Sequence, residues 1–160
     1  MHETYTDITR ALHRGIYLAD MSSKSANYCS AYSSGGTALL LLCEAELGNP
    51  MYELLGSSYT AGEEAKEKGL YSTWGKGSTG PSKWKDAKCV NTALAGCMMV
   101  SIEWWLSTFR VSSSELTCHQ PDVSVKPGPT NVPGAYLQYN EFIVYDVAQI
   151  RLRYLFRVRM

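Results

Sequence analysis

The sequence lacks an excess of charge of either sign, because 15 basic and 15 acidic residues give a formal net charge of zero at pH 7. Binding to DNA or RNA normally needs clustered positive charge, so we expect no direct nucleic-acid binding by this segment. Long hydrophobic runs are missing too. The longest, Thr37–Cys43 and Ala93–Met99, are too short to cross a bilayer, and the chain begins with the acidic residues Glu3 and Asp7, unlike a secretory signal. We therefore expect no membrane partner.

Paired cysteines are also lacking. The five cysteines are odd in number and no two stand at C-x-x-C spacing, so neither a disulfide framework nor a zinc site is predicted. The three histidines form no metal-ligand pattern with them. The remaining composition, 45% hydrophobic and 19% charged over 160 residues, is typical of one globular domain in a reducing, intracellular compartment.

Two short helices are indicated by capping patterns. Asp20 or Ser22 can cap a helix over Lys24–Tyr28, because both side chains can accept a hydrogen bond from an early backbone N–H. Thr60 is followed three residues later by Glu63, which is a capping-box pattern, and Gly69 supplies a stop. This second segment predicts a short, solvated helix.

Strand periodicity dominates the end of the chain. Residues 139–146 alternate in the way of a strand, and residues 151–159 alternate between apolar side chains and arginines. The second strand is expected to have one apolar face (Leu152, Tyr154, Phe156, Val158) and one cationic face (Arg151, Arg153, Arg157, Arg159) that protects a sheet edge from pairing.

The rest of the chain is less decisive. The apolar segment Thr37–Leu47 is compatible with a buried helix or a buried strand. The polar, glycine-rich segment Trp74–Asp86 and the proline-rich segment Pro127–Pro133 are both predicted to be connections.

Two blocks carry chemistry. They are Gly15–Cys29 (GIYLADMSSKSANYC) and Tyr139–Asp146 (YNEFIVYD). They closely resemble the nicotinamide-pocket segment and the glutamate-bearing segment of the catalytic domain of poly(ADP-ribose) polymerases. Between them, Leu47-Gly48 with Met51–Leu54 and the Gly75-x-Gly77-x-x-x-Pro81 spacing follow the same pattern. The resemblance covers about residues 15–99 and 121–160.

The resemblance implies an α+β fold, the mixed split β-sheet of ADP-ribosyltransferases. It also implies an enzyme that uses NAD as a cosubstrate and releases nicotinamide. The expected acceptors are protein side chains or a growing ADP-ribose polymer, and the expected location is the nucleus, in DNA repair.

Particular site residues follow from the resemblance. Glu141 is the expected catalytic carboxylate, which stabilises the positive charge that develops on the ribose when the glycosidic bond to nicotinamide breaks. Tyr17 and Tyr28 are expected to flank the nicotinamide ring, with Tyr17 also counted among the catalytic residues. Ser25 is expected to bond the carboxamide, because its hydroxyl can both donate and accept. Gly15 and Lys24 complete the expected NAD-binding set, and no metal is expected.

The sequence departs from the family in two places. Residues 1–14 are interpreted as a non-family leader, and the family's upstream His-Gly element, which binds NAD, is not found. The domain is therefore expected to cover 15–160 and to be incomplete at its N-terminal side. The segment Val100–Gln120 has no family counterpart and is interpreted as a non-native insertion. Its first two residues can be encoded by a splice-donor sequence and its last by an acceptor, so a retained intron is one hypothesis and a genuine, partner-binding insertion is the other.

Three functions remain open from the sequence. The first is an NAD-dependent protein ADP-ribosyltransferase, impaired by the missing segment. The second is a non-catalytic remnant that acts as a binding or interaction module. The third is a mis-spliced fragment of a full polymerase that has no stable fold of its own.

Overall fold

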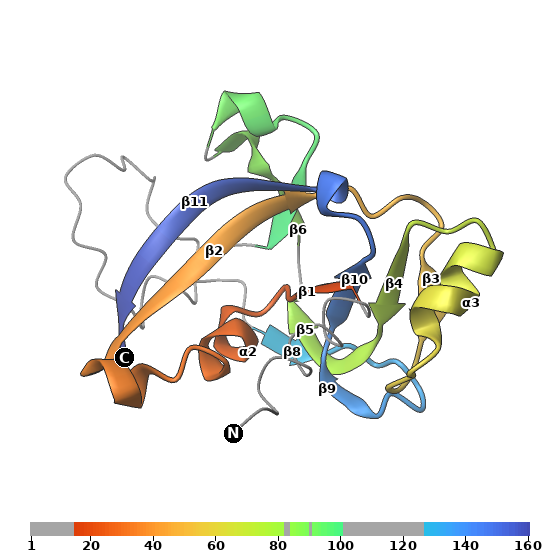
Figure 1. The fold of residues 1–160 in the computed structure, drawn as a ribbon, viewed down its shortest axis with the longest axis horizontal. Coiled ribbons are helices and arrows are strands. Elements are labelled where there is room, and N and C mark those ends of the chain that lie inside the picture. Colours follow the sequence, from red (N-terminus) through yellow and green to blue (C-terminus); the bar gives the residue numbers. More distant parts are fainter. Residues whose placement is uncertain (1–14, 82–83, 90, 101–126) are drawn as a thin grey trace, which may run out of the picture.

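The computed structural model describes residues 15–81, 84–89, 91–100 and 127–160, and strands dominate this part of the chain (Figure 1). The strands are β1 (Ile16–Leu18), β2 (Thr37–Ala45), β3 (Tyr52–Leu54), β4 (Ser72–Gly75), β5 (Gly77–Pro81), β6 (Trp84–Asp86), β7 (Met98–Val100), β8 (Pro127–Pro129), β9 (Leu137–Tyr139), β10 (Glu141–Val144) and β11 (Ile150–Arg159). The helices are α2 (Ser22–Asn27), α3 (Ala61–Glu67) and four short 3-10 turns, Ala31–Ser34, Ala87–Cys89, Thr92–Leu94 and Val147–Gln149. The expectation of a mixed fold of strands and helices is confirmed, and the more specific ADP-ribosyltransferase architecture stays a prediction.

The central sheet has the strand order β1-β10-β4-β3. β10 pairs in antiparallel fashion with both of its neighbours, whereas β3 and β4 are parallel and are connected through α3. The apolar side chains of β10 are buried, with Val144 fully so. β10 and β4 are the two inner strands of this sheet, each with a partner on both edges.

A long two-stranded ribbon is formed by β2 and β11, which pair in antiparallel fashion over almost their whole length (Figure 1). The segment that the sequence left undecided is therefore a strand. The inner face of the ribbon buries Ala38, Leu40 and Val158, which pack with Cys29, Ala31 and Phe156.

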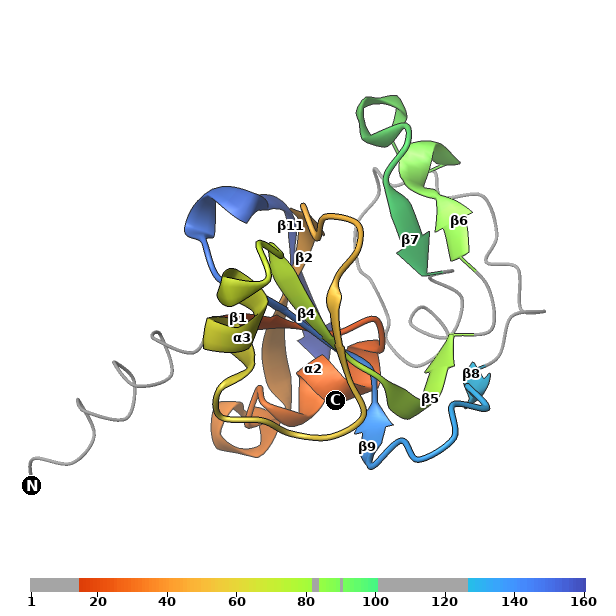
Figure 2. The same cartoon turned by 90° about the vertical axis from the view of Figure 1, so that its right-hand side faces the viewer.

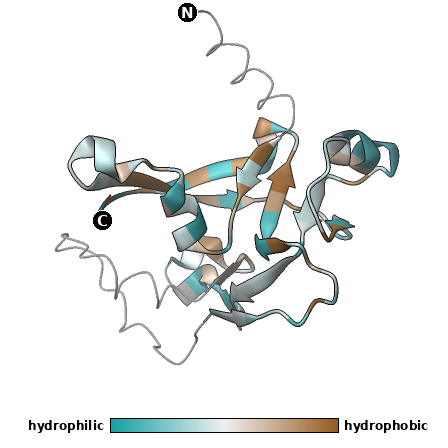
Figure 3. Ribbon diagram, turned by 90° about the horizontal axis from the view of Figure 1, so that it is seen from below, coloured by the Kyte–Doolittle hydropathy of each residue, from teal (hydrophilic) through white to brown (hydrophobic). Residues whose placement is uncertain are grey.

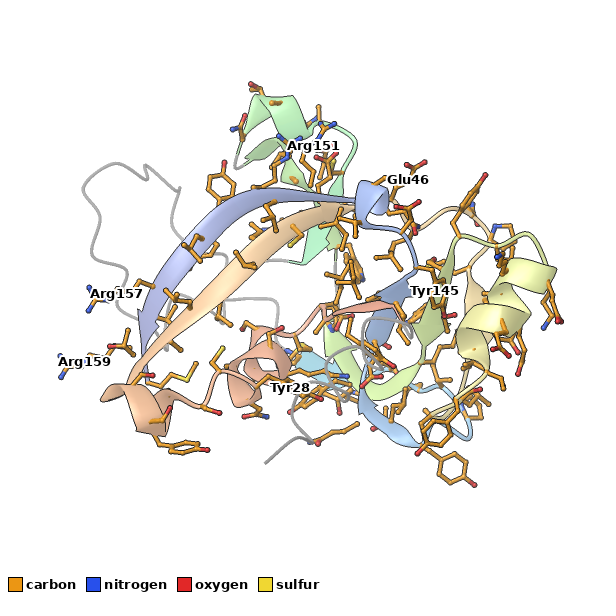
Figure 4. The ribbon with its side chains drawn as sticks, in the orientation of Figure 1. Tyr28, Glu46, Tyr145, Arg151, Arg157 and Arg159 are labelled. Carbon is orange, nitrogen blue, oxygen red and sulfur yellow. The ribbon has the colours of Figure 1, made fainter. Side chains whose placement is uncertain are left out.

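The predicted faces of β11 are only partly right. A register shift between Leu152 and Tyr154 inserts an extra residue, and such a bulge moves the residues on one side of it to the other face of the strand. Leu152 is consequently 63% exposed instead of buried. Arg157 and Arg159 project outward near the end of β11, as predicted (Figure 4).

The segment Trp74–Asp86, predicted to be a connection, instead forms strands at most of its described residues. β5 lies between β8 and β9 in a three-stranded sheet, and β6 pairs with β7 in a hairpin set apart from the central sheet (Figure 2). β8 also occupies the start of the second predicted connection, Pro127–Pro133. The first prediction was wrong and the second was wrong for Pro127–Pro129 alone, because the partners of the glycine- and proline-rich strands β5 and β8 are distant in sequence.

Both predicted helices are present, but their predicted caps are not formed. α2 has Met21 at its N-cap position, without a side-chain hydrogen bond, and neither Asp20 nor Ser22 caps it. Thr60 stands at the N-cap of α3, yet its hydroxyl donates to the Glu64 carboxylate rather than accepting from the backbone. α3 is mostly hydrophilic, as a solvated helix should be (Figure 3).

The expected insertion Val100–Gln120 lies outside the described residues except for Val100, the last residue of β7. The expected leader, residues 1–14, lies outside them entirely. Among the helices of the described residues, none is long and apolar enough to cross a membrane.

Candidate functional site

Glu141 is the first residue of β10, an inner strand of the central sheet. On the neighbouring strand, Tyr17 pairs with Ile143, two residues further along β10. Side chains two residues apart on a strand point to the same face, so Tyr17 and Glu141 are diagonal neighbours on one face of the sheet. Local strand pairing therefore brings together one residue from each of the two sequence blocks.

The helix α2 carries further residues of the first block to the same place. The Lys24 ammonium forms an ion pair with Glu141 Oε1, across 117 positions of sequence. The two side chains are only 15% and 25% exposed, so water screens their attraction less than at an open surface. This contact places Lys24 next to Glu141, and the NAD-binding role expected of Lys24 stays a prediction.

Ser25 and Tyr28 lie on α2 and directly after it. Within the described residues the Ser25 hydroxyl has no hydrogen-bond partner, whereas its carbonyl accepts from the Tyr28 backbone N–H at 3.1 Å. Tyr28 is 80% exposed and Tyr17 55% exposed. Tyr28 lies at the end of α2, whereas Tyr145 lies just after β10, towards α3 (Figure 4). Both tyrosines that are expected to flank nicotinamide thus keep accessible ring surface.

The structure requires glycine at position 15, independently of any ligand. Its φ is +101°, and a Cβ built on it would lie 2.6 Å from Ile143 Cγ2 and 2.7 Å from the Val144 carbonyl oxygen. Only glycine tolerates both the backbone conformation and this approach to β10. The position sets how closely β1 lies beside β10, and any contact of Gly15 with NAD stays a prediction.

Asn140 and Asp20 are two polar residues next to Glu141 and Lys24 that the sequence did not single out as site residues. Asn140, directly before Glu141, is 5% exposed. Its amide donates to Asp20 Oδ2 at 2.7 Å and accepts from the Gly77 N–H at 2.9 Å and from the Trp74 indole at 3.3 Å. Asp20 was considered only as a helix cap. The contact is long-range, so no local pattern of residues could have indicated it.

The electrostatics of Asp20 differ from those of a surface carboxylate. Burial raises the pKa of Asp20, while the hydrogen bond from Asn140 and the nearby charge of Lys24 oppose that rise. Its second oxygen, Oδ1, is buried without a hydrogen-bond partner among the described residues. No group of three or more potential metal ligands occurs within the described part of the chain.

The described residues therefore define a strand-rich mixed α/β structure in which an inner strand carries a carboxylate, with a lysine of α2 paired to it and a tyrosine on the adjacent strand. Comparison with known families identifies it further. The family model of the poly(ADP-ribose) polymerase catalytic domain matches residues 6–98, which is more than half of the chain, so this chain belongs to that family. The match begins at residue 6 and so includes residues 6–14 of the expected leader. It ends just before the expected insertion.

Curated relatives agree with this assignment. The chain is 39% identical to poly(ADP-ribose) polymerase 2-A of Oryza sativa over 146 residues and 37% identical to poly(ADP-ribose) polymerase 2 of Homo sapiens over 150 residues. It is 34% identical to poly(ADP-ribose) polymerase 1 of Xenopus laevis over 147 residues. Each alignment covers 91% of this chain but only 17%, 20% and 11% of the respective relative. The chain thus spans a fifth or less of these relatives.

Proposed function

We propose that this chain is an NAD-dependent ADP-ribosyltransferase whose NAD site lies between α2 and the first residue of β10. The observation that carries the proposal is the ion pair between Lys24 and Glu141. It places the helix of the first sequence block against the carboxylate of the second, which is the arrangement that one shared site requires.

The binding roles are assigned to the first block. Tyr17 and Tyr28 present aromatic surface, which suits stacking on the flat nicotinamide ring. The Ser25 hydroxyl has no hydrogen-bond partner among the described residues, and it can both donate to and accept from the nicotinamide carboxamide. Lys24 can bind a ribose hydroxyl or the acceptor through its ammonium, after it has exchanged part of its contact with Glu141. Gly15 allows the close approach of β1 and β10 on which this grouping depends.

The chemical role is assigned to Glu141. In the proposed reaction the bond between nicotinamide and ribose breaks, nicotinamide leaves with the bonding electron pair, and positive charge develops on the ribose. The Glu141 carboxylate accepts a hydrogen bond from the ribose 2′-hydroxyl and stabilises that charge. An acceptor nucleophile then forms the new bond to the ribose and loses its proton. A preorganised charged group of this kind typically contributes roughly 10²–10³ in rate.

The acceptors we propose are protein side chains or a growing ADP-ribose polymer, because the relatives are named as poly(ADP-ribose) polymerases. A nuclear location in DNA repair and the absence of direct nucleic-acid binding remain predictions from the sequence. The interpretation of Val100–Gln120 as an insertion likewise remains a prediction.

The test is transfer of ADP-ribose from labelled NAD to the chain itself. Glu141→Gln keeps the size and polarity of the side chain and removes its charge, so transfer is expected to fall roughly 10²–10³-fold. The matched control is Glu53→Gln. Glu53 is likewise paired with a lysine, Lys76, but lies on β3, at the far edge of the sheet from β1. If the parent transfers ADP-ribose and the Glu141→Gln variant transfers it equally well, the role assigned to Glu141 is contradicted.

A second candidate is a non-catalytic interaction module. Four leucines on the outer face of the β2–β11 ribbon, Leu39, Leu41, Leu152 and Leu155, are each about 60% exposed, and clustered exposed apolar side chains are typical of contact surfaces. This candidate predicts a cooperative thermal transition and no transfer from NAD. A chain without any cooperative transition would instead be a fragment with no stable fold.

A further inference from the structure

Asn140 occupies the point at which the chain passes from β9 to β10, directly before the proposed catalytic carboxylate. Its side chain forms three hydrogen bonds, with Asp20, Gly77 and Trp74. Because the residue is almost completely buried, each of these bonds is protected from competition with water. Asn140, directly before the first residue of β10, is therefore held both by the connection after β1 and by the consecutive strands β4 and β5.

Glycines of β5 make the space in which Asn140 sits. A Cβ at Gly80 would lie 2.8 Å from Asn140 Nδ2, and a Cβ at Gly77 would lie 2.4 Å from the Asn140 backbone nitrogen. Contacts this close leave no room for another side chain. The position of the Asn140 amide is consequently determined by packing as well as by hydrogen bonds.

Asp20 is the partner of Asn140 on the other side of the site. It lies in the short connection between β1 and α2, four residues before Lys24. The bond between Asn140 Nδ2 and Asp20 Oδ2 therefore connects the start of β10 to the segment that leads into α2. It is a second link between the two sequence blocks, beside the ion pair of Lys24 with Glu141.

We propose that Asn140 and Asp20 are positioning residues, whose hydrogen bond holds α2 at a fixed place relative to Glu141. The short side chains of Asn and Asp lose little freedom when they pair, whereas a lysine must order four flexible bonds to form an ion pair. The buried bond thus sets the geometry, and Lys24 remains free to exchange its partner. The consequence for catalysis rests on the proposed function, but the link between α2 and β10 does not.

The test uses a charge exchange between the two positions. Asn140→Asp places two carboxylates side by side and should break the link. In the double variant Asp20→Asn/Asn140→Asp, the new amide at position 20 can donate to the new carboxylate at position 140, which still accepts from Gly77 and Trp74. The exchange therefore restores the pairing with its polarity reversed.

Backbone hydrogen exchange gives a readout that needs no activity. The Lys24 and Ser25 amides donate to the Met21 carbonyl at 3.1 and 3.4 Å, and they should exchange at least about tenfold faster in Asn140→Asp, as expected for the loss of a hydrogen bond to a charged group. The Leu70 amide, which donates to the Ala65 carbonyl at 2.8 Å, is the reference at α3. Parent-like exchange in the double variant is the expected result.

Two results would overturn the proposal. One is equal acceleration at Leu70, which would mean general destabilisation. The other is a double variant that exchanges, or fails to fold, like Asn140→Asp.

Steady-state kinetics with NAD separate this proposal from the proposed function. If the parent turns over NAD, kcat of Asn140→Asp should fall at least about tenfold with KM changed much less, and the double variant should recover to within roughly threefold. A loss confined to KM, or no recovery in the double variant, contradicts a positioning role. A parent that turns over no NAD contradicts the proposed function alone, because hydrogen exchange still decides whether the two residues position α2.

Discussion

Replacement of Gly77 by alanine tests how β5 meets the site. A Cβ at this position would lie 2.2 Å from the Tyr139 carbonyl carbon and 2.4 Å from the Asn140 nitrogen. Both are backbone atoms, so no side chain can rotate away, and the backbone of β5 or of the junction between β9 and β10 must move instead. The Gly77 N–H would also lose its 2.9 Å bond to Asn140 Oδ1.

The expected cost follows from these contacts. Overpacking typically costs about 1–3 kcal/mol, and the upper value applies here because backbone must shift. For a chain of this size about 3 kcal/mol lowers Tm by roughly 6–12 °C. The matched control is Gly128→Ala on the adjacent strand β8, where a Cβ would meet nothing within 4 Å. That variant should stay within about 0.5 kcal/mol of the parent.

The assay is thermal unfolding of parent, Gly77→Ala and Gly128→Ala under identical conditions. Equal Tm values for the two variants would refute the reasoning, since they would show that β5 does not approach β9 and Asn140 as closely as described.

The remaining predictions concern Gly15 and Asp20. Gly15→Ala should destabilise more than Gly96→Ala by about 2 kcal/mol, as measured by urea unfolding; both positions have positive φ, but only the Cβ of the first would collide with its surroundings. Equal costs would contradict the close approach of β1 to β10. Because burial raises the pKa of Asp20 above its ordinary 3.8, the folded chain keeps this proton to higher pH than the unfolded chain, and this residue's contribution to stability falls as pH rises from about 4 through the folded pKa. Asp20→Asn can still accept a hydrogen bond from Asn140 but does not titrate, so its stability should rise relative to that of the parent as the pH increases across that window. The measurement is urea unfolding at a series of pH values. A stability difference that does not change with pH would contradict the burial of Asp20.

The elements that the sequence predicted well are those with local signals. The alternation of residues 151–159 predicted β11. Gly69 predicted where α3 stops, and the helix ends two residues before it, at Glu67. The alternation over residues 139–146 predicted strand, but it did not show the break at Asn140 that separates β9 from β10. That break depends on buried contacts with Asp20, Trp74 and Gly77.

The failures share a physical cause. Glycine-rich β5 has weak intrinsic preference for a strand, and it becomes one because β8 and β9 supply hydrogen-bonding partners about 50–60 residues away. The segment of β2 was ambiguous for the same reason, since only its pairing with β11 decides between strand and helix. The bulge next to Leu152 likewise cannot be read from alternation alone.

The candidate site was foreseen in part. Its residues were assigned by resemblance, and the structure places Lys24 directly against Glu141, with Tyr17 on the adjacent strand. Their roles toward NAD stay predictions. Asn140 was passed over because a buried asparagine next to a glutamate has no spacing signature, and its importance appears only when three distant segments meet.

The most direct test of the central claim, that α2 and β10 form one nicotinamide-binding site, is titration of the isotopically labelled chain with nicotinamide while backbone NMR signals are followed. The account predicts that the signals of Ser25 and Tyr28 on one side and of Glu141 on the other shift together, with one saturation curve, while those of α3 stay unchanged. Shifts confined to another part of the chain, or no shift at millimolar nicotinamide in a folded chain, would contradict it.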